Sequence, residues 1–170
     1  DVNIYSMTID NFSRNILHKT FCVVGDPIAH SLSPSIHSWF AESEGDNVSY
    51  SKIKVAPGSL KTAIDEFIRV GGTGMNVTVP LKEEAYSIAH RHSERARFAG
   101  AANVLSFKDD GEIVADNTDG YGLVTDLMRN QHLVLKGKVV FLLGAGGAAR
   151  GVLGNLASQD PSLIQFSNRT

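Results

Sequence analysis

Segments typical of strands and of helices alternate in the first half of the chain, and this order restricts the fold more than any other feature of the sequence. Short apolar runs bounded by glycine or proline are each followed by a segment with apolar residues at helical spacing. In the segment 57–72, for example, Leu60, Ile64, Phe67 and Ile68 fall on one helical face. The alternation predicts an α/β fold with a mostly parallel sheet that helices cover on both faces.

The pattern changes in the second half. Segments 101–107 and 112–117 flank the turn "KDDG", which predicts a β-hairpin. Further on, 138–159 has the pattern of a strand, a glycine-rich loop and a helix, and the last residues begin another strand. We therefore expect a first α/β unit that is joined, near residues 119–124, to the beginning of a second unit of the Rossmann type.

Charge and hydropathy exclude two classes of partner. The chain has 16 Lys and Arg against 18 Asp and Glu, a formal net charge of −2, which argues against binding to nucleic-acid phosphates. No apolar run reaches the roughly 18 residues of a membrane span. The first residues lack the basic-then-apolar layout of a secretory signal. We expect a cytoplasmic protein with neither nucleic acid nor membrane as its partner.

Cysteine and histidine do not form a pattern of reactive or metal-binding residues. The single cysteine, Cys22, lies in the apolar run "FCVV", and we interpret it as a core residue in a reducing compartment rather than as a reactive thiol. His30, His90 and His92 have no cysteine or acid at the spacing of metal ligands. We therefore predict no metal site.

The stretch "GAGGAARG" lies between an apolar strand and an apolar helix, which is the context of a dinucleotide-binding loop. Gly144 allows a tight turn, Gly146 lets the backbone approach a pyrophosphate, and Ala149 takes the place of the third glycine. Free N–H groups at the start of the helix would face the phosphates. No Gly-Lys-Ser/Thr closes the motif, so it is not a P-loop. A packing turn without a ligand stays open as the alternative.

The strand after this loop ends in "SNRT", where an NAD-binding protein commonly carries an acidic residue. Arg169 has a planar set of donors that suits the 2′-phosphate of NADP. The alternative is an exposed surface arginine without a ligand. The position of Arg169 just past the strand favours NADP over NAD.

Polar side chains also gather in four other loops and strand ends. Because the carboxyl ends of parallel strands face one crevice, we expect these groups to converge. Lys82 and Asp119 are suited to proton transfer, since a nearby carboxylate can hold an ammonium group in place. Structural alternatives are open: Ser33 and Asp119 as helix caps, Asn103 as a turn residue and Lys82 as a solvated lysine. The full set is Ser31, Ser33, Asn76, Thr78, Lys82, Asn103 and Asp119.

Six motifs follow one another from Phe21 to the end of the chain: "VVGDPIAHSLSPSIH", "GMNVTVPLKE", "GAANVL", "DNTDGYG", "GAGGAARG" and "NRT". In order and spacing, they together resemble the shikimate dehydrogenase family. The resemblance implies NADPH-dependent, reversible reduction of 3-dehydroshikimate to shikimate, in the pathway to chorismate and the aromatic amino acids. It also implies an extension over 1–20, a shikimate-binding catalytic domain over 21–119 and the beginning of an NADP-binding Rossmann domain over 120–170.

The resemblance also implies a role for each site residue. Lys82 would be the catalytic acid/base with Asp119 as its partner, so that hydride reaches the ketone carbon while Lys82 protonates the developing alkoxide. Ser31 and Ser33 would hold the substrate carboxylate, and Asn76, Thr78, Asn103 and Asp119 the hydroxyl groups. The cofactor contacts would be Gly144, Ala145, Gly146, Gly147 and Ala148 at the pyrophosphate, Asn168, Arg169 and Thr170 at the 2′-phosphate, and more weakly Glu94.

The chain departs from the family pattern in two ways. Val104 stands where the family usually has threonine, which removes one hydroxyl group near the substrate. Family members also continue well beyond "NRT", through the rest of the nucleotide-binding sheet and through helices that return to the first domain. We therefore expect the chain to be the amino-terminal portion of a shikimate dehydrogenase, with little or no turnover by itself.

Three other functions stay open at this point. A quinate/shikimate dehydrogenase that uses NAD is the nearest, and Arg169 argues against it. A non-catalytic module that binds shikimate-like acids is the second. A regulatory or assembly domain is the third, and the presence of both Lys82 and Asp119 argues against it. The sequence does not fix the oligomeric state and leaves a homodimer open.

Overall fold

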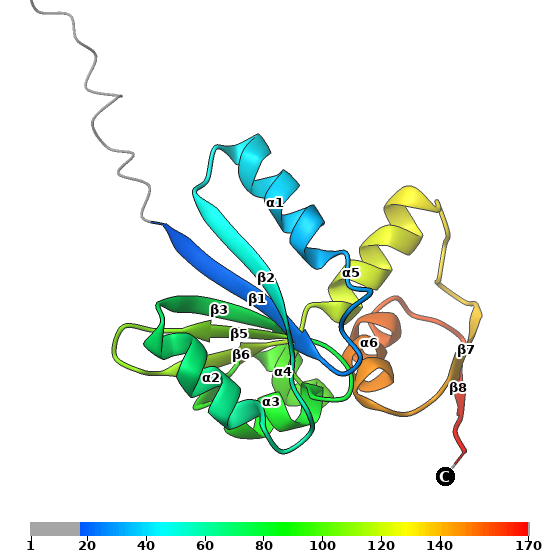
Figure 1. Cartoon of the computed structure of the whole chain (residues 1–170). Coiled ribbons are helices and arrows are strands. Elements are labelled where there is room, and N and C mark those ends of the chain that lie inside the picture. The colour runs from blue at the N-terminus through cyan, green and yellow to red at the C-terminus, as the bar shows by residue number, and fades with distance from the viewer. Residues whose placement is uncertain (1–17, 170) are drawn as a thin grey trace, which may run out of the picture.

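The computed structural model describes residues 18–169, and most of them surround one six-stranded sheet (Figure 1). Its strands lie in the order β2-β1-β3-β5-β6-β4. They are β1 (Lys19–Gly25), β2 (Val48–Lys54), β3 (Gly72–Val77), β4 (Arg91–His92), β5 (Val104–Phe107) and β6 (Ile113–Asp116). The helices of this part are α1 (Ser33–Glu44), α2 (Leu60–Arg69), α3 (Lys82–Ile88) and α4 (Glu94–Ala99).

Pairing within this sheet is mixed but mainly parallel. β1 pairs in parallel with β2 and with β3, and β4 pairs in parallel with β6. β5 is antiparallel to both of its neighbours, β3 and β6. The predicted α/β class and the predicted hairpin are both confirmed. Figure 1 shows α1 on one face of the sheet and α2 and α3 on the other.

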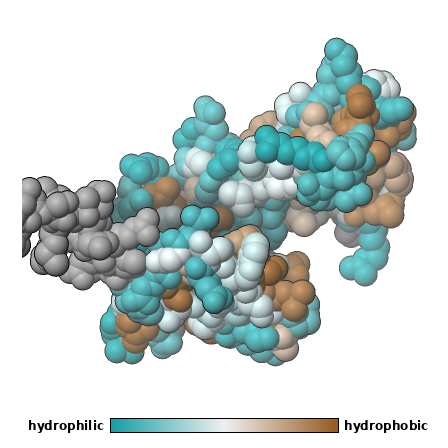
Figure 2. Space-filling view, turned by 90° about the horizontal axis from the view of Figure 1, so that it is seen from above, coloured by the Kyte–Doolittle hydropathy of each residue, from teal (hydrophilic) through white to brown (hydrophobic). Residues whose placement is uncertain are grey.

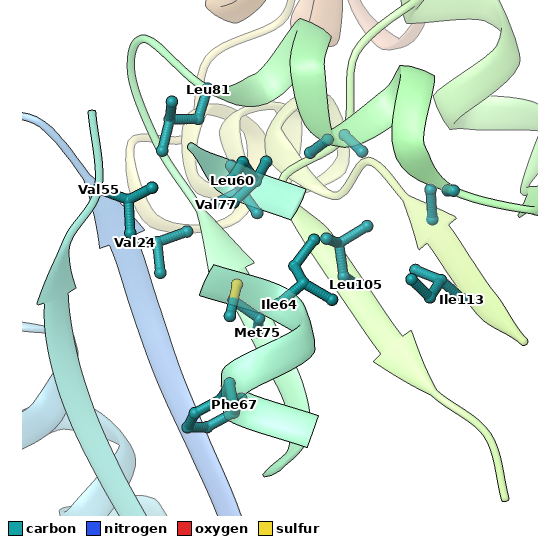
Figure 3. Packing of buried hydrophobic residues seen from close by; sticks show 14 of the residues in the cluster. Val24, Val55, Leu60, Ile64, Phe67, Met75, Val77, Leu81, Leu105 and Ile113 are labelled. Atoms are coloured by element: carbon teal, nitrogen blue, oxygen red, sulfur yellow. The ribbon is translucent and has the colours of Figure 1, made fainter. Parts of the chain in front are cut away.

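The hydrophobic core lies between the sheet and α2, as the helical spacing predicts (Figure 3). Leu60 and Ile64 are fully buried, and Phe67 is 7% exposed. Burying a side chain of this size stabilises the fold by about 1.5–3 kcal/mol. Ile68, which the spacing placed on the same face, is 38% exposed because it lies at the margin of the buried stripe.

Cys22 is part of this core. It is fully buried in β1, and burial raises the pKa of its thiol to about 12. At neutral pH the thiol is therefore protonated and shielded from reagents. The interpretation of Cys22 as a core residue is confirmed.

The starts of α1 and α5 (Asp119–Thr125) differ from the capping expected for them. Leu32 and Thr118 occupy the N-cap positions, so Ser33 and Asp119 are already the first helical residues and neither caps its helix. The Ser31 hydroxyl accepts instead from the Ser33 N–H (3.3 Å). The capping interpretation of these two side chains is wrong, which leaves both available for other contacts.

Glu84 links α3 to α2. Its carboxylate accepts from the N–H groups of Gly58 and Leu60, each at 3.0 Å, so it supplies partners to the unpaired donors at the beginning of α2. The sequence marks Glu83 and Glu84 only as acids at the first turn of a helix. Glu84 therefore has a structural role across the core that the local pattern does not show.

The second part of the chain forms a two-stranded parallel sheet and two helical segments. β7 (Val139–Leu143) pairs with β8 (Leu163–Ser167). The helix α6 (Gly147–Ala157) packs against α4 and α5. A π-helical segment, η2 (Asp126–Asn130), continues α5. Exposed apolar side chains gather on the sheet formed by β7 and β8. Figure 1 places this sheet at one end of the molecule, and Figure 2 shows hydrophobic residues at that end. They include Val139, Phe141, Leu143, Leu163 and Phe166.

The extension expected over 1–20 falls mostly on residues 1–17, outside the described part of the chain. Residues 18–20 are described, and β1 begins at Lys19, two residues before the expected start of the first domain at residue 21. Over residues 18–169, none of the helices combines the length and the apolar character that crossing a membrane requires.

Candidate active site

Lys82 and Asp119 form an ion pair at the carboxyl ends of two strands. Lys82 is the first residue of α3, just after β3, and Asp119 begins α5, just after β6. The distance from Lys82 Nζ to Asp119 Oδ2 is 2.5 Å, and the two side chains are only 14% and 23% exposed. A pair shielded in this way interacts more strongly than a surface pair. The alternative of a solvated lysine is therefore wrong.

Asn103 and Asn117 hold Asp119 in place. Asn103 Nδ2 donates to Asp119 Oδ1 (2.8 Å), while Asn103 Oδ1 accepts from the Thr118 N–H (2.9 Å). Asn117, which is 1% exposed, accepts from the Asp119 N–H (3.1 Å) and donates to the Ala101 carbonyl (3.0 Å). Sequence reasoning included Asn103 but not Asn117, whose only signal was its place inside "DNTDG".

A second set of polar groups continues this network away from the ion pair. Asn76 Nδ2 donates to the Asn103 carbonyl oxygen (3.4 Å), and Asn76 Oδ1 accepts from the Tyr50 hydroxyl group (2.7 Å). Asn76, Asn103 and Asp119 are thus brought together as expected. Tyr50, on β2, was not expected here.

Thr78 and Lys82 line a cavity together with the glycine-rich loop. Its volume is about 110 Å³, and Gly147 and Ala148 form its other side. Gly25 is needed beside it, because a Cβ atom on Gly25 would lie 2.5 Å from Thr78 Cγ2 and 3.0 Å from the Val79 carbonyl oxygen. The cavity joins the candidate substrate groups to the candidate cofactor loop.

The glycine-rich loop has the geometry that its sequence predicts. Gly144 has a φ of +107°, a conformation that glycine adopts without strain, and Gly146 is the N-cap residue of α6. The Gly144 N–H donates to the Ser167 carbonyl (2.8 Å), which places the end of β8 beside the loop. Asn168 and Arg169 follow directly, whereas Thr170 lies outside the described residues.

Glu94 lies elsewhere. It is the first residue of α4 and lines a cavity of about 780 Å³ with the second half of α6, including Gly154, Asn155 and Ala157. The residues that line this cavity do not include any of 144–148. The structure therefore does not bring Glu94 together with the loop that the resemblance assigned to the same cofactor.

Within residues 18–169, no three His, Cys, Asp or Glu side chains gather as the ligands of a metal ion would. Chemically, the site combines one ammonium group, one carboxylate and several amide and hydroxyl groups. These groups can bind a small polyhydroxylated acid and move a proton at one of its oxygen atoms.

Asp116, beside the site, is expected to make the fold sensitive to acid. Its carboxylate accepts from Ser93 Oγ (2.5 Å), from the Asn117 N–H (2.7 Å) and from Arg95. Burial would raise its pKa, but the hydrogen bonds from Arg95 and Ser93 outweigh burial and hold the pKa of Asp116 below its ordinary value. Because the folded-state pKa is the lower one, this stabilisation is present above about pH 4 and is lost as the pH falls further.

Asp116→Asn is therefore expected to lower the free energy of unfolding at pH 7 by about 1–2 kcal/mol, with a smaller difference at pH 3. Urea denaturation at the two pH values measures this. Asp65→Asn is the matched control, because Asp65 pairs with Lys61 on the exposed face of α2. An equal loss at both pH values for Asp116→Asn would contradict the prediction.

Comparison with known proteins agrees with this geometry. A family model described as "Shikimate dehydrogenase substrate binding domain" matches residues 23–105. The NADP(+)-dependent shikimate dehydrogenase of Janthinobacterium sp. (strain Marseille) is 50% identical over 150 residues, which are 88% of this chain and 55% of that protein. That of Vibrio cholerae serotype O1 (strain M66-2) is 51% identical over 88% of this chain and 54% of its own length.

Solved structures give the same result. Shikimate dehydrogenase from Aquifex aeolicus superimposes with a TM-score of 0.82 at 33% identity, over 92% of this chain and 57% of that one. The Thermus thermophilus enzyme in complex with NADP(H) and shikimate gives 0.80 at 34% identity, over 89% and 56%. The chain spans about half the length of the curated relatives it matches. Residues 23–105 therefore match the substrate binding domain of shikimate dehydrogenases, and the chain is similar to members of that family over 88% of its length.

Proposed function

We propose that this chain binds shikimate and serves an NADP-dependent shikimate dehydrogenase, which interconverts shikimate and 3-dehydroshikimate. The observation that carries the proposal is the shielded Lys82–Asp119 pair, 2.5 Å apart, which lies in a row of amide groups and next to the glycine-rich loop. A purely structural ion pair would not need to share a cavity with that loop. Relatives named as NADP(+)-dependent shikimate dehydrogenases support the assignment, and so does a similar structure solved with NADP(H) and shikimate.

The residues would divide the work between binding and proton transfer. Ser31 and Ser33, at the start of α1, would bind the carboxylate of the acid, and Asn76, Thr78, Asn103 and Asp119 would bind its hydroxyl groups. Lys82 would hold a proton at the oxygen atom that changes between alcohol and ketone. Asp119 would keep the Lys82 ammonium group charged and in position, fixed by Asn103 on its other oxygen.

The residues around the loop fit a dinucleotide. Gly146 and Gly147 carry no side chain that would keep a pyrophosphate from the backbone, and α6 begins there with unpaired N–H groups. When bound, NADPH supplies the hydride. We propose that Arg169 recognises its 2′-phosphate, since the contact between Gly144 and Ser167 holds the end of β8 beside the loop. Residues 21–119 would then be the substrate domain and 120–170 the beginning of the cofactor domain.

The first test is calorimetric titration of shikimate into the chain, where we expect binding that is lost with Asn103→Ala. The second is shikimate-dependent reduction of NADP⁺ and NAD⁺, followed by nicotinamide absorbance. This assay would use two proteins. One is the chain itself, and the other is a hybrid in which the chain is followed by the part of the Janthinobacterium protein that the chain does not match. Reduction of NADP⁺ supports the proposal. Shikimate binding without hydride transfer in the hybrid would identify a binding module instead.

A further inference from the structure

We propose that Tyr50 is a positioning residue for the substrate, which fixes the orientation of the Asn76 amide through its hydroxyl group. This inference rests on the proposed function and deepens it. Neither the sequence motifs nor the names of the relatives assign a role to Tyr50, which lies on β2, outside all six motifs. The structure assigns it through the contacts at both ends of its side chain.

At one end, the Tyr50 hydroxyl group contacts a residue of the candidate site. It donates to Asn76 Oδ1 at 2.7 Å. Burial, the largest influence, raises the pKa of Tyr50, so the hydroxyl group is protonated at neutral pH and acts as a donor. A tyrosine hydroxyl carries a single O–H donor, so Asn76 Oδ1 takes the one hydrogen bond that Tyr50 can donate.

At the other end, the ring of Tyr50 is held by His37 of α1. The two rings are stacked with their centroids 4.3 Å apart and their planes only 3° apart. Burial lowers the pKa of His37, which favours the neutral imidazole in this stack. The ring is therefore fixed against α1, the helix whose first residue is Ser33.

The contact with Tyr50 determines which way the donor and acceptor groups of the Asn76 amide point. Because Oδ1 accepts from Tyr50, the Nδ2 group must point the other way, and it does, towards the Asn103 carbonyl oxygen at 3.4 Å. Nδ2 has two N–H groups, so one can serve Asn103 and the other the substrate. Without the Tyr50 hydroxyl group the amide could turn over and offer an acceptor where the acid needs a donor.

The contacts form a continuous row from α1 to the ion pair. Tyr50 contacts Asn76, Asn76 contacts Asn103, Asn103 contacts Asp119, and Asp119 contacts Lys82. Tyr50 lies at the end of the row farthest from the proton-transfer pair. We therefore expect loss of its hydroxyl group to weaken binding of the acid much more than it slows hydride transfer.

The test is calorimetric titration of shikimate into the wild-type chain and three variants: Tyr50→Phe, Asn76→Ala and the double variant. Tyr50→Phe keeps the ring and its stacking with His37 and removes only the hydroxyl group. It should weaken shikimate binding about fivefold to tenfold, the value of one hydrogen bond. In the Asn76→Ala background the same change should have less than a twofold effect, because the partner through which Tyr50 acts is gone. A purely structural role would give equal effects in both backgrounds.

Tyr86→Phe is the matched control, since the ring of Tyr86 packs against His92 at the other edge of the sheet. It should leave shikimate binding unchanged, and thermal unfolding would verify that every variant is folded. Wild-type affinity in a folded Tyr50→Phe variant overturns this inference and leaves the proposed function intact. Failure of the folded wild-type chain to bind shikimate overturns the proposed function itself.

Discussion

Replacing Lys82 with alanine should lower the rate of shikimate-dependent NADP⁺ reduction by about a thousandfold, the usual contribution of a general acid/base. The affinity for shikimate should fall much less, by about 10-fold to 150-fold, because losing one hydrogen bond to a charged group costs about 1.5–3 kcal/mol and the amide groups remain. Lys82 donates to Asp119 Oδ2 at 2.5 Å, so its ammonium group is held in a fixed position beside the glycine-rich loop.

The rate would be measured on the hybrid protein by nicotinamide absorbance, and the affinity by calorimetry on the chain. Lys82→Met is a second variant that keeps the length of the side chain and so separates the lost charge from an empty space. Lys61→Ala is the control, because Lys61 is an exposed lysine that pairs with Asp65 on α2. A loss of less than tenfold with Lys82→Ala would remove Lys82 from the chemistry and leave it a binding residue.

Replacing Ile64 with alanine should destabilise the fold by about 3 kcal/mol, within the range of about 2–5 kcal/mol for large-to-small changes in a core. Ile64 is fully buried where α2 packs on the sheet, among Leu60, Met75 and Leu105 (Figure 3). The loss combines the transfer energy of the missing carbons with the cavity that they leave.

Ile68→Ala is the matched control, because it makes the same chemical change one turn further along the same helix at a residue that is 38% exposed. It should cost less than about 1 kcal/mol. Urea denaturation of both variants gives the comparison, read as a change in midpoint at constant slope. Equal losses for the two variants would mean that α2 does not pack as described.

The sequence predicted the elements that local pattern determines. The alternation of segments gave the class of the fold, the turn "KDDG" gave the hairpin, and the spacing in α2 gave most of its buried face. The segment 80–92 has the sequence pattern of one helix, but α3 ends at Ile88. Beyond it, the backbone of His90 and the strand β4 pair with the region of β6. Such pairing with a distant strand overrides a local helical pattern and leaves no mark in the local sequence.

A short helix was missed although its signal was present. Ser93 caps α4 by accepting from the Ala96 N–H (3.1 Å), a pattern that the sequence shows as serine before a charged first turn. The helix has only six residues, too few for hydrophobic spacing to reveal it. Its existence depends on tertiary contacts, above all those with α6.

Only part of the candidate site could be predicted from the sequence, because its residues occupy different positions in the strands and loops. Lys82, Asn103 and Asp119 stand at strand ends, where the topology of an α/β sheet gathers polar groups, so their convergence could be expected. Tyr50 lies within a strand, where an aromatic residue is usually interpreted as one that only packs against its neighbours. Its hydroxyl group matters only because β2 lies beside β1 and faces α1, an arrangement of the folded chain that no motif contains.

The strand order also has a consequence for how the chain acquires its site while it folds. β1, β2 and β3 are neighbours in space and early in the chain, so they can collapse together soon after synthesis. β4 precedes the hairpin in sequence yet pairs with β6, so it must wait for the hairpin to dock against β3. Asp119 follows the hairpin directly, and until it arrives Lys82 lacks this counter-charge. We therefore expect β1, β2 and β3 to become compact before the Lys82–Asp119 ion pair forms.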